Sequence, residues 1–348
     1  MKELSFLNKI LYLLNSISLL LLLSSYLSVY ISPVFFWQIS FIGLIFPLLY
    51  VINILFLIYW GVSFKKPIWA NIIILIIGFG NFKQYFGTSP NNMSSKENIK
   101  VLTYNVRLFN KYNWLKKPNI LEETYKFLEI ENADILCIQE FYTVNKIPSL
   151  EYPYRHIGSQ SNKKKWHMAI YSKYQQLNKE TVNVNGKRMN NTCIYSDMLI
   201  KEDTIRVYNI HLASNWFNTA DYSFMQNPQR REIKEGILGL MDRMKKSFRK
   251  RAKEVDLIKQ HMSASPYPII VCGDFNDTPV SYAYNSIKGN LIDAFSYSGK
   301  GIGDSFVNIP ALRIDYILHD SSFKSTNYQK HRTILSDHYP ISCEISIP

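Results

Sequence analysis

A short apolar run that ends in polar side chains has the residue types needed to bind a metal ion or a phosphate. Residues 269–272 read Ile-Ile-Val-Cys, and Gly273, Asp274, Phe275 and Asn276 follow. Alternate side chains of an extended chain share a face, so Asp274 and Asn276 point the same way. The carboxylate can bind a cation or accept a proton, and the amide can donate to an anionic oxygen. A simple turn is the alternative interpretation.

The same arrangement recurs along the chain. Five other strand-like runs lead into, or contain, a polar residue suited to chemistry, and these residues are Asn105, Glu140, His211, Asp315 and the pair Asp337 and His338. One such run would be a coincidence, whereas six indicate strands whose ends converge on one cleft. We therefore expect one site that strand ends position.

The motifs at these strand ends occur in a defined order. They are Tyr104-Asn105, Gln139-Glu140, Asn209–Leu212, Gly273–Asn276, Arg313–Tyr316 and Ser336–His338. This series resembles the endonuclease/exonuclease/phosphatase superfamily, whose metal-dependent phosphoesterases include pancreatic deoxyribonuclease, neutral sphingomyelinase and inositol polyphosphate phosphatases. The resemblance covers about residues 98–348 and does not extend to the first ninety or so.

The resemblance implies a divalent-metal site. Glu140 is the expected main ligand, with Asn105 and Asp337 as its partners. Oxygen ligands of this kind suit Mg²⁺ or Mn²⁺ better than zinc. Arg313, two residues before Asp315, is a candidate for contact with a phosphate.

The resemblance also implies catalytic roles. His338 is expected beside the scissile phosphate, with Asp315 orienting its ring as in other Asp-His pairs. Asp274 is expected to position or deprotonate the attacking water, and Asn276 and His211 to donate to phosphate oxygens. The sequence leaves open whether Asp274 or His338 is the general base.

The predicted function is hydrolysis of phosphodiester or phosphomonoester bonds by a divalent-metal-dependent phosphoesterase. Residues 91–348 contain 35 Lys and Arg against 26 Asp and Glu, a net charge of +9, which suits a polyanionic substrate, either nucleic acid or a phospholipid or other phosphodiester. The Asn-Ile-His-Leu motif at 209–212 resembles the deoxyribonuclease, sphingomyelinase and inositol phosphatase branches more than the abasic-site endonucleases. The alternative is a catalytically inactive, membrane-tethered binding module with the same fold.

The first part of the chain has a different composition. No charged residue lies between Lys9 and Lys65, and a bilayer span needs about 20 apolar residues. We predict a transmembrane helical anchor that uses the lipid bilayer as its partner, then a linker and a catalytic domain. The boundaries are 1–86 for the anchor, with spans at about 10–31, 37–62 and 68–85, then 87–98 for the linker and 99–348 for the catalytic domain.

Lysines suggest the orientation of the anchor. Lys2 and Lys9 precede the first span, Lys65 and Lys66 follow the second, and positive loops stay in the cytoplasm. With three spans the catalytic domain lies outside a bacterial cytoplasmic (inner) membrane, whereas with two spans it would be cytoplasmic. We expect a multi-pass monomer with an extracytoplasmic catalytic domain.

The remaining pattern defines the fold class. Strand-rich blocks alternate with single helices, among them a long helical segment at 232–262, which is typical of an α/β fold. The resemblance implies a four-layer α/β sandwich in which two packed mixed β-sheets are flanked by helices. A basic run at 245–251 is either a solvated helix face or a contact with an anionic surface.

Overall fold

The chain divides into two compact units in a computed structural model, which describes residues 5–63, 65–88, 97–143, 150–158, 166–214 and 233–348. The helical unit comprises Met1–Gln84, Asn215–Ala252 and Asp277–Asn285. The sheet unit comprises Tyr85–Ser214, Lys253–Asn276 and Ser286–Pro348. Residues 89–96 of the predicted linker lie outside the described residues, and the predicted domain boundaries stay predictions.

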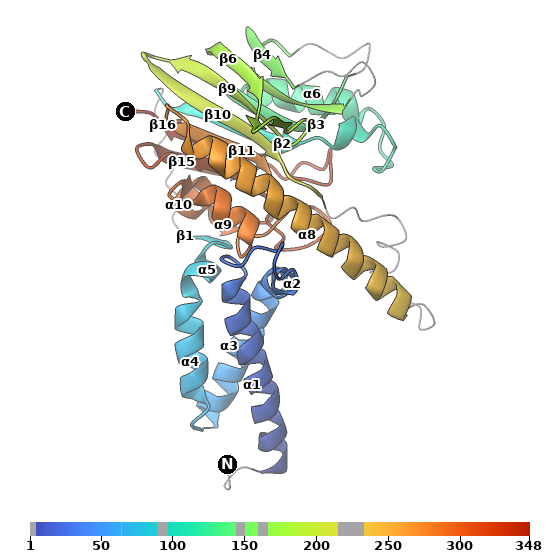
Figure 1. Cartoon of the computed structure of the whole chain (residues 1–348), viewed down its shortest axis with the longest axis vertical. Coiled ribbons are helices and arrows are strands. Elements are labelled where there is room, and N and C mark those ends of the chain that lie inside the picture. The colour runs from blue at the N-terminus through green and yellow to red at the C-terminus, as the bar shows by residue number, and fades with distance from the viewer. Residues whose placement is uncertain (1–4, 64, 89–96, 144–149, 159–165, 215–232) are drawn as a thin grey trace. The chain divides into compact units, whose positions relative to one another are not determined.

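The helical unit begins with five helices (Figure 1). They are α1 (Phe6–Leu27), α2 (Gln38–Leu44), α3 (Phe46–Val62), α4 (Ile68–Ile77) and α5 (Phe79–Lys83). Among the described residues, α1 alone is long and apolar enough to cross a membrane by itself. The pair α2 and α3 qualifies if counted as one span, although it bends by 61°, and α4 is a shorter apolar helix.

Three buried asparagines hold α1, α3 and α4 together. Asn15 and Asn71 exchange hydrogen bonds of 2.9 and 3.1 Å between their side-chain amides. The Asn53 amide donates to the Ser18 hydroxyl at 2.8 Å, and the Trp60 indole donates to the Asn15 carbonyl oxygen at 2.9 Å. Each bond joins two different helices, so the polar groups of the bundle satisfy one another inside it.

Later parts of the chain complete the helical unit at one end of α1. Ser28, which caps α1, donates to the Val280 carbonyl at 2.9 Å, and the Asn285 amide donates to the Val29 carbonyl at 3.0 Å. A Cβ atom at Gly43 would lie 2.6 Å from the Val280 oxygen, so only glycine permits this approach. The segment that follows Asn276 therefore packs on the helices.

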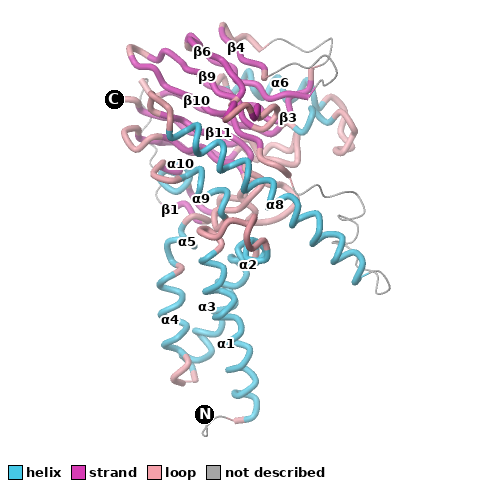
Figure 2. The backbone as a smooth tube through the Cα atoms, viewed as in Figure 1, coloured by secondary structure: helices cyan, strands magenta, loops and turns pink. Residues whose placement is uncertain are grey.

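Two six-stranded mixed sheets form the sheet unit (Figure 2). The first has the order β12 (Ile292–Asp293), β14 (Asp315–His319), β11 (Ile269–Asp274), β10 (Asp203–His211), β9 (Cys193–Ile200) and β6 (Gln175–Thr181). The second has the order β15 (Lys324–Lys330), β16 (Ile341–Ser346), β2 (Ile99–Asn105), β3 (Ile135–Tyr142), β5 (Trp166–Ser172) and β4 (Tyr154–Ile157).

Two small ribbons and several further helices complete the described part of the chain. Two small ribbons pair β1 (Phe86–Thr88) with β13 (Lys300–Ile302) and β7 (Asn183–Val184) with β8 (Lys187–Arg188). The remaining helical elements are the turn η1 (Arg107–Asn110) and the helices α6 (Ile120–Glu131), α8 (Ile233–Ser263), α9 (Tyr282–Lys288) and α10 (Ala294–Ser298). The long helix predicted at 232–262 is thus present as α8.

The core lies between the two sheets. One buried cluster joins Val101 and Cys137 of the second sheet to Val207, Ile270 and Ile317 of the first. On the outer face of the second sheet, α6 packs over β2 and β3 (Figure 1). On the outer face of the first sheet, α8 is joined to β10 by a 2.9 Å hydrogen bond between His261 Nδ1 and the Tyr208 hydroxyl. The predicted class, an α/β fold with two packed mixed sheets flanked by helices, is confirmed.

A buried amide pair crosses between the sheets. The Asn209 side chain, on β10, donates to the Ile138 and Ala169 carbonyls of the opposite sheet, both at 2.9 Å. Its oxygen accepts a 2.7 Å bond from Gln139, which also donates to Thr103 at 2.9 Å. Both amides are fully buried, so each lost bond would remove a hydrogen bond from a buried polar group that water cannot reach.

This geometry predicts that Asn209→Ala destabilises the fold strongly. The Ile138 and Ala169 carbonyls and the Gln139 amide each lose their bond to Asn209, which costs about 3 kcal/mol or more and lowers the melting temperature by about 6 to 12 °C. Thermal unfolding of the purified chain measures the shift. Asn178→Ala, at a half-buried position on β6, is the matched control and should cost less than about 1 kcal/mol. Equal losses in the two variants would contradict the role assigned to Asn209.

Candidate active site

The predicted site residues lie at corresponding strand ends. Asn105 ends β2, whose parallel partner β3 carries Glu140, while His211 and Asp274 are register partners at the ends of the parallel strands β10 and β11. Asp315 opens β14 and pairs with Asp274 across the antiparallel ladder. The carboxyl ends of parallel strands meet at one edge of a sheet, and antiparallel neighbours begin there, so the pattern in the sequence follows from the topology.

Asn105 connects the carboxylates of the two sheets. Its amide donates to Asp274 at 3.0 Å and approaches Glu140 at 3.4 Å. Glu140 sits where the β3–β5 register shifts, with φ of 51°, and this irregularity re-aims its side chain. His211 Nε2 lies 3.6 Å from a Glu140 oxygen and 3.7 Å from Asp274. Four predicted site residues therefore share one cluster.

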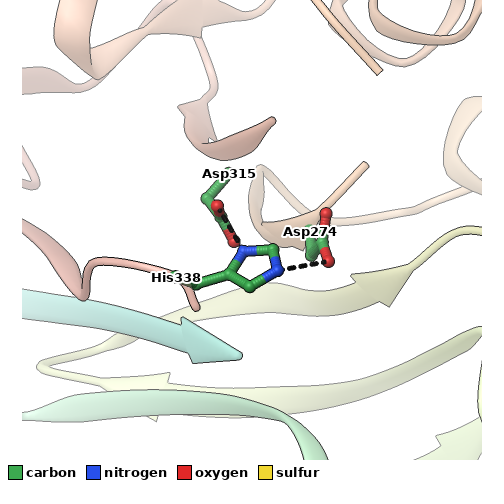
Figure 3. Close-up of side chains that lie close together, drawn as sticks. All are labelled: Asp274, Asp315 and His338. Atoms are coloured by element: carbon green, nitrogen blue, oxygen red, sulfur yellow. Dashed lines mark hydrogen bonds and ion pairs between the residues drawn. The ribbon is translucent and has the colours of Figure 1, made fainter. Parts of the chain in front are cut away.

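His338 lies between two carboxylates (Figure 3). Its Nδ1 is 2.9 Å from Asp315 Oδ2, and its Nε2 is 3.7 Å from Asp274 Oδ2. Asp315 is held in turn by its backbone N–H, which donates to the Ser305 hydroxyl at 2.9 Å. The Asp-His pair predicted from the sequence is thus present, with Asp274 on the other side of the ring.

Asn276 holds Asp274 in place. Its backbone N–H donates to Asp274 Oδ1 at 2.8 Å, and its amide donates to Asp274 Oδ2 at 3.1 Å and to the Leu212 carbonyl at 3.0 Å. Gly273 has φ of 140°, and a Cβ atom there would meet the Ile210 carbonyl at 1.9 Å. Only glycine at position 273 lets β11 pair with β10 beside Ile210. This pairing fixes the position of the next residue, Asp274.

Asp337 meets a residue that the sequence analysis did not assign. Arg107 Nη1 lies 2.9 Å from Asp337 Oδ2, and the Arg107 backbone N–H donates to Asn105 Oδ1 at 3.0 Å. Asp337 also comes within 4.0 Å of His338 Nε2. The available signal was the position of Arg107, two residues after Asn105.

Arg313 does not approach the site. Its side chain is 1% exposed and pairs with Asp293, with one guanidinium–carboxylate contact at 2.7 Å. The expectation that it contacts a phosphate is wrong, because Asp293 on β12 holds the guanidinium inside the fold. The sequence of the motif does not indicate which carboxylate its arginine will pair with in the folded chain.

The crowded carboxylates shift one another's ionisation. Burial, followed by the charge of Asp337, raises the pKa of Glu140 to about 7. Burial likewise raises the pKa of Asp274, although His338 opposes this. Burial would lower the pKa of His338, but Asp315 and Asp274 outweigh it and hold that pKa well above its ordinary value. At neutral pH the ring therefore carries a positive charge between two acids.

This donor set fits a hard divalent cation. Glu140, Asp337 and Asn105 offer the oxygen ligands that Mg²⁺ and Mn²⁺ prefer, and a bound cation would offset the burial and the neighbouring negative charge that raise the pKa of Glu140. Ligand atoms of Asp274, Asp315 and His338 also lie within 4.8 Å of one another. The division into metal ligands and catalytic residues remains a prediction.

Comparison with known proteins identifies the family. The endonuclease/exonuclease/phosphatase family profile matches residues 102–338, which is more than half of the chain and includes every predicted site residue. The chain belongs to this family. A second profile, for a domain of unknown function, matches residues 8–85, so the helices before the sheet unit are outside the family's own domain.

Two vertebrate proteins are similar to this family member in sequence. Protein angel homolog 2 of Danio rerio is 27% identical over 193 residues, and that of Mus musculus is 28% identical over 198 residues. Each match covers 53% of the chain, but only 31% and 32% of the relatives. The chain therefore spans about a third of the length of these relatives.

Solved structures show the same fold. A conserved protein of unknown function from Enterococcus faecalis has a TM-score of 0.52 at 14% identity and covers 72% of this chain and all of that one. The human Nocturnin catalytic domain, with a bound sulfate anion, has a TM-score of 0.51 at 15% identity, covering 77% and 99%. A mannosyl-6-phosphatase from Bacteroides thetaiotaomicron has a TM-score of 0.50 at 16% identity, covering 72% and 100%.

The raised pKa of Glu140 predicts that Glu140→Gln stabilises the metal-free protein at alkaline pH. A carboxyl whose pKa rises on folding contributes stability below its ordinary pKa of 4.5 and loses it as pH rises through about 7. In chelator at pH 8 the variant should therefore be more stable than the wild type, by up to about 3 kcal/mol.

Thermal unfolding at two pH values measures this effect. At pH near 5, below the folded pKa of about 7, the difference should shrink, because Glu140 is then mostly protonated. Saturating Mg²⁺ at pH 8 should reverse the order, since the cation stabilises only the protein that keeps the carboxylate. If the wild type is more stable than the variant in chelator at pH 8, the raised pKa of Glu140 is refuted.

Proposed function

We propose that the chain is a membrane-anchored, divalent-metal-dependent phosphoester hydrolase. The observation that carries the proposal is the His338 ring, 2.9 Å from Asp315 and 3.7 Å from Asp274, beside the Glu140 and Asn105 side chains. An oriented imidazolium, a carboxylate and a set of oxygen ligands are the groups that hydrolysis of a phosphoester needs. Membership of the family supports the same reaction class.

His338 acts as the acid in this mechanism. Asp315 accepts a hydrogen bond from Nδ1, which fixes the ring and stabilises its positive charge. The Nε2 proton lies on the Asp274 side of the ring, where it can bond a phosphoryl oxygen or pass to the leaving oxygen as the P–O bond breaks. The raised pKa of His338 supports this assignment, because the ring holds its proton at neutral pH.

Asp274 acts as the base. Asn105 and Asn276 hold its two oxygens, so the carboxylate has one fixed orientation beside His338. It accepts a proton from water as the water oxygen attacks phosphorus, while His338 supplies a proton to the leaving group. The two transfers balance, and the products are an alcohol or sugar hydroxyl and a phosphate.

The other site residues bind and orient. His211, beside Glu140 and Asp274, can donate to a phosphoryl oxygen, and the Asn276 amide can do so by replacing its bond to Leu212. A divalent cation held by Glu140, Asn105 and Asp337 would supply Lewis-acid stabilisation of the charge on the phosphoryl oxygens. The net charge of +9 on residues 91–348 supports a polyanionic substrate.

The inside-out character of the helical bundle supports a membrane anchor. Large apolar side chains such as Leu20, Leu55 and Ile76 are exposed, while the side chains of Asn15, Asn53 and Asn71 are buried. In water the apolar side chains would be covered and the amides exposed. A lipid bilayer favours helical bundles whose outer side chains are apolar and whose inner polar side chains are hydrogen-bonded to one another.

The two ends of this bundle support the proposed extracytoplasmic side. Lys65 and Lys66 lie between α3 and α4, whereas Ser28 and Val29, at the other end of α1, contact residues 280 and 285. The lysines favour a cytoplasmic position for their end. The segment that follows Asn276 then lies on the extracytoplasmic side of a bacterial inner membrane.

The activity predicts a specific response to Asp315→Asn. The purified chain should hydrolyse bis-p-nitrophenyl phosphate with Mg²⁺ and lose this activity in chelator. The variant should lower kcat by about 100-fold or more, because His338 loses the partner that orients and charges it. The alkaline limb of the pH profile should move to lower pH, since the charge that raises the pKa of His338 is gone.

A matched control separates this effect from a general loss. Asp203→Asn removes an exposed carboxylate at the start of β10 and should leave the pH profile unchanged. A metal-dependent site would be rejected if the wild type kept its turnover in chelator and the Glu140→Gln variant also kept its turnover. No turnover by a folded, metal-loaded wild type would favour the inactive binding module.

The topology predicts the side of the C-terminus. Alkaline phosphatase fused after Pro348 should be active in a bacterial host, because it folds only outside the cytoplasm, and a green fluorescent protein fusion at the same point should stay dark. The control is the same pair fused after Lys66, where the outcome should invert. A fluorescent C-terminal fusion with inactive phosphatase would place the catalytic residues in the cytoplasm.

A further inference from the structure

The chain takes an unusual conformation directly after Asn105. Residues Arg107, Leu108, Phe109 and Asn110 have φ of 43°, 54°, 51° and 57°. Four successive residues with side chains in the left-handed region are costly, and such strain persists only where the surroundings impose it. Strained backbone gathers at functional sites, so this turn raises the question of what it presents.

Contacts on both sides of the turn impose the conformation. Phe109 is buried and packs against Phe141 and Tyr125, with ring centroids 5.6 and 5.4 Å apart. The Asn110 side chain donates to the Leu115 carbonyl and accepts from the Leu115 N–H, both at 2.9 Å. Residues 111–114 therefore form a short loop whose two ends are pinned together.

The pinned loop exposes aromatic rings and a cation. Tyr112 is 62% exposed and Trp114 is 39% exposed, with their centroids 5.1 Å apart. Lys111 Nζ lies 5.3 Å from the Tyr112 ring centroid and donates to the Tyr142 hydroxyl at 2.6 Å. Apolar burial does not explain these rings, because they remain in solvent after the fold is complete.

Arg107 connects this loop to the candidate active site. Its guanidinium lies 4.4 Å from the centroid of the Trp114 ring, and its Nη1 lies 2.9 Å from Asp337. One side chain thus contacts both the exposed aromatic cluster and a predicted metal ligand next to His338. A substrate whose phosphate reaches His338 would extend over residues 111–114 if it leaves the site in this direction.

We propose that Lys111, Tyr112 and Trp114 form a nucleobase-stacking platform, so that the phosphoester hydrolysed at the adjacent site belongs to a single-stranded nucleic acid or nucleotide. The inference rests on the proposed hydrolase function and names its substrate class. Exposed aromatic rings with flanking cations are the combination that binds single-stranded nucleic acids, because rings stack on bases while cations contact phosphates. A phospholipid would instead need a continuous apolar surface.

Paired oligomers test the platform by binding. The full-length chain in detergent micelles is titrated in chelator with two fluorescent single strands of about ten nucleotides, a length within the usual range of such sites. One is DNA, and the other has the same phosphates but abasic residues. Fluorescence anisotropy should give binding of the DNA strand that is about 10-fold to 100-fold tighter.

Variants locate the preference on the loop. Tyr112→Ala with Trp114→Ala should abolish the difference between the two oligomers, whereas Tyr112→Phe with Trp114→Phe should keep most of it, because the rings remain. Tyr297→Ala, an exposed tyrosine on α10, is the matched control and should keep the full preference. Equal binding of the two oligomers by the wild type overturns the proposal, as does a preference that survives the double alanine variant.

Turnover separates this inference from the proposed function. With Mg²⁺ added, cleavage of DNA faster than of the abasic strand supports both. Cleavage of both strands at one rate keeps the hydrolase and overturns the platform. Preferential binding of DNA without cleavage of any phosphoester keeps the platform as a binding surface and overturns the hydrolase.

Discussion

The candidate site depends on the fixed separation of two sheets, which one buried amide pair helps to set. Asn105 and Glu140 come from one sheet, His338 lies three residues before β16 of that sheet, and His211, Asp274 and Asp315 come from the other sheet. A shift of either sheet would separate the His338 ring from Asp274. Asn209 bonds the carbonyls of Ile138 and Ala169 and the Gln139 side chain, immediately beside Glu140 and His211. Directional bonds fix spacing in a way that apolar packing alone does not.

Within that frame the charges conflict. Glu140, Asp274 and Asp337 converge, and the cationic groups that oppose them are His338 and Arg107. The fold tolerates this conflict because Asp315 and the asparagines hold each group in place. Such an arrangement is unfavourable for stability but suited to binding a cation and a phosphate, which is the usual balance between stability and function at an active site.

The sequence predicted the fold class and the cluster of strand-end residues, because a polar side chain after an apolar strand has a location that the topology determines. It could not predict what depends on contacts between distant parts of the chain. Arg313 was named as a candidate for phosphate contact although it pairs with Asp293 inside the fold, and Arg107 was missed because nothing local indicates that its turn is left-handed. The cross-sheet role of Asn209 was equally invisible, since its partners lie about 40 to 70 residues away in the sequence.

The three asparagines inside the helical bundle have a consequence for the order of biosynthesis. Asn15 and Asn53 emerge from the ribosome before Asn71, yet Asn71 supplies the reciprocal partner of Asn15. Until α4 is made, an amide in α1 lacks a bond that apolar surroundings cannot replace. The polar contacts inside the bundle are therefore complete only when α4 is present, and a chain that stops before residue 71 leaves Asn15 with the Trp60 indole as a partner but without its reciprocal bonds to Asn71.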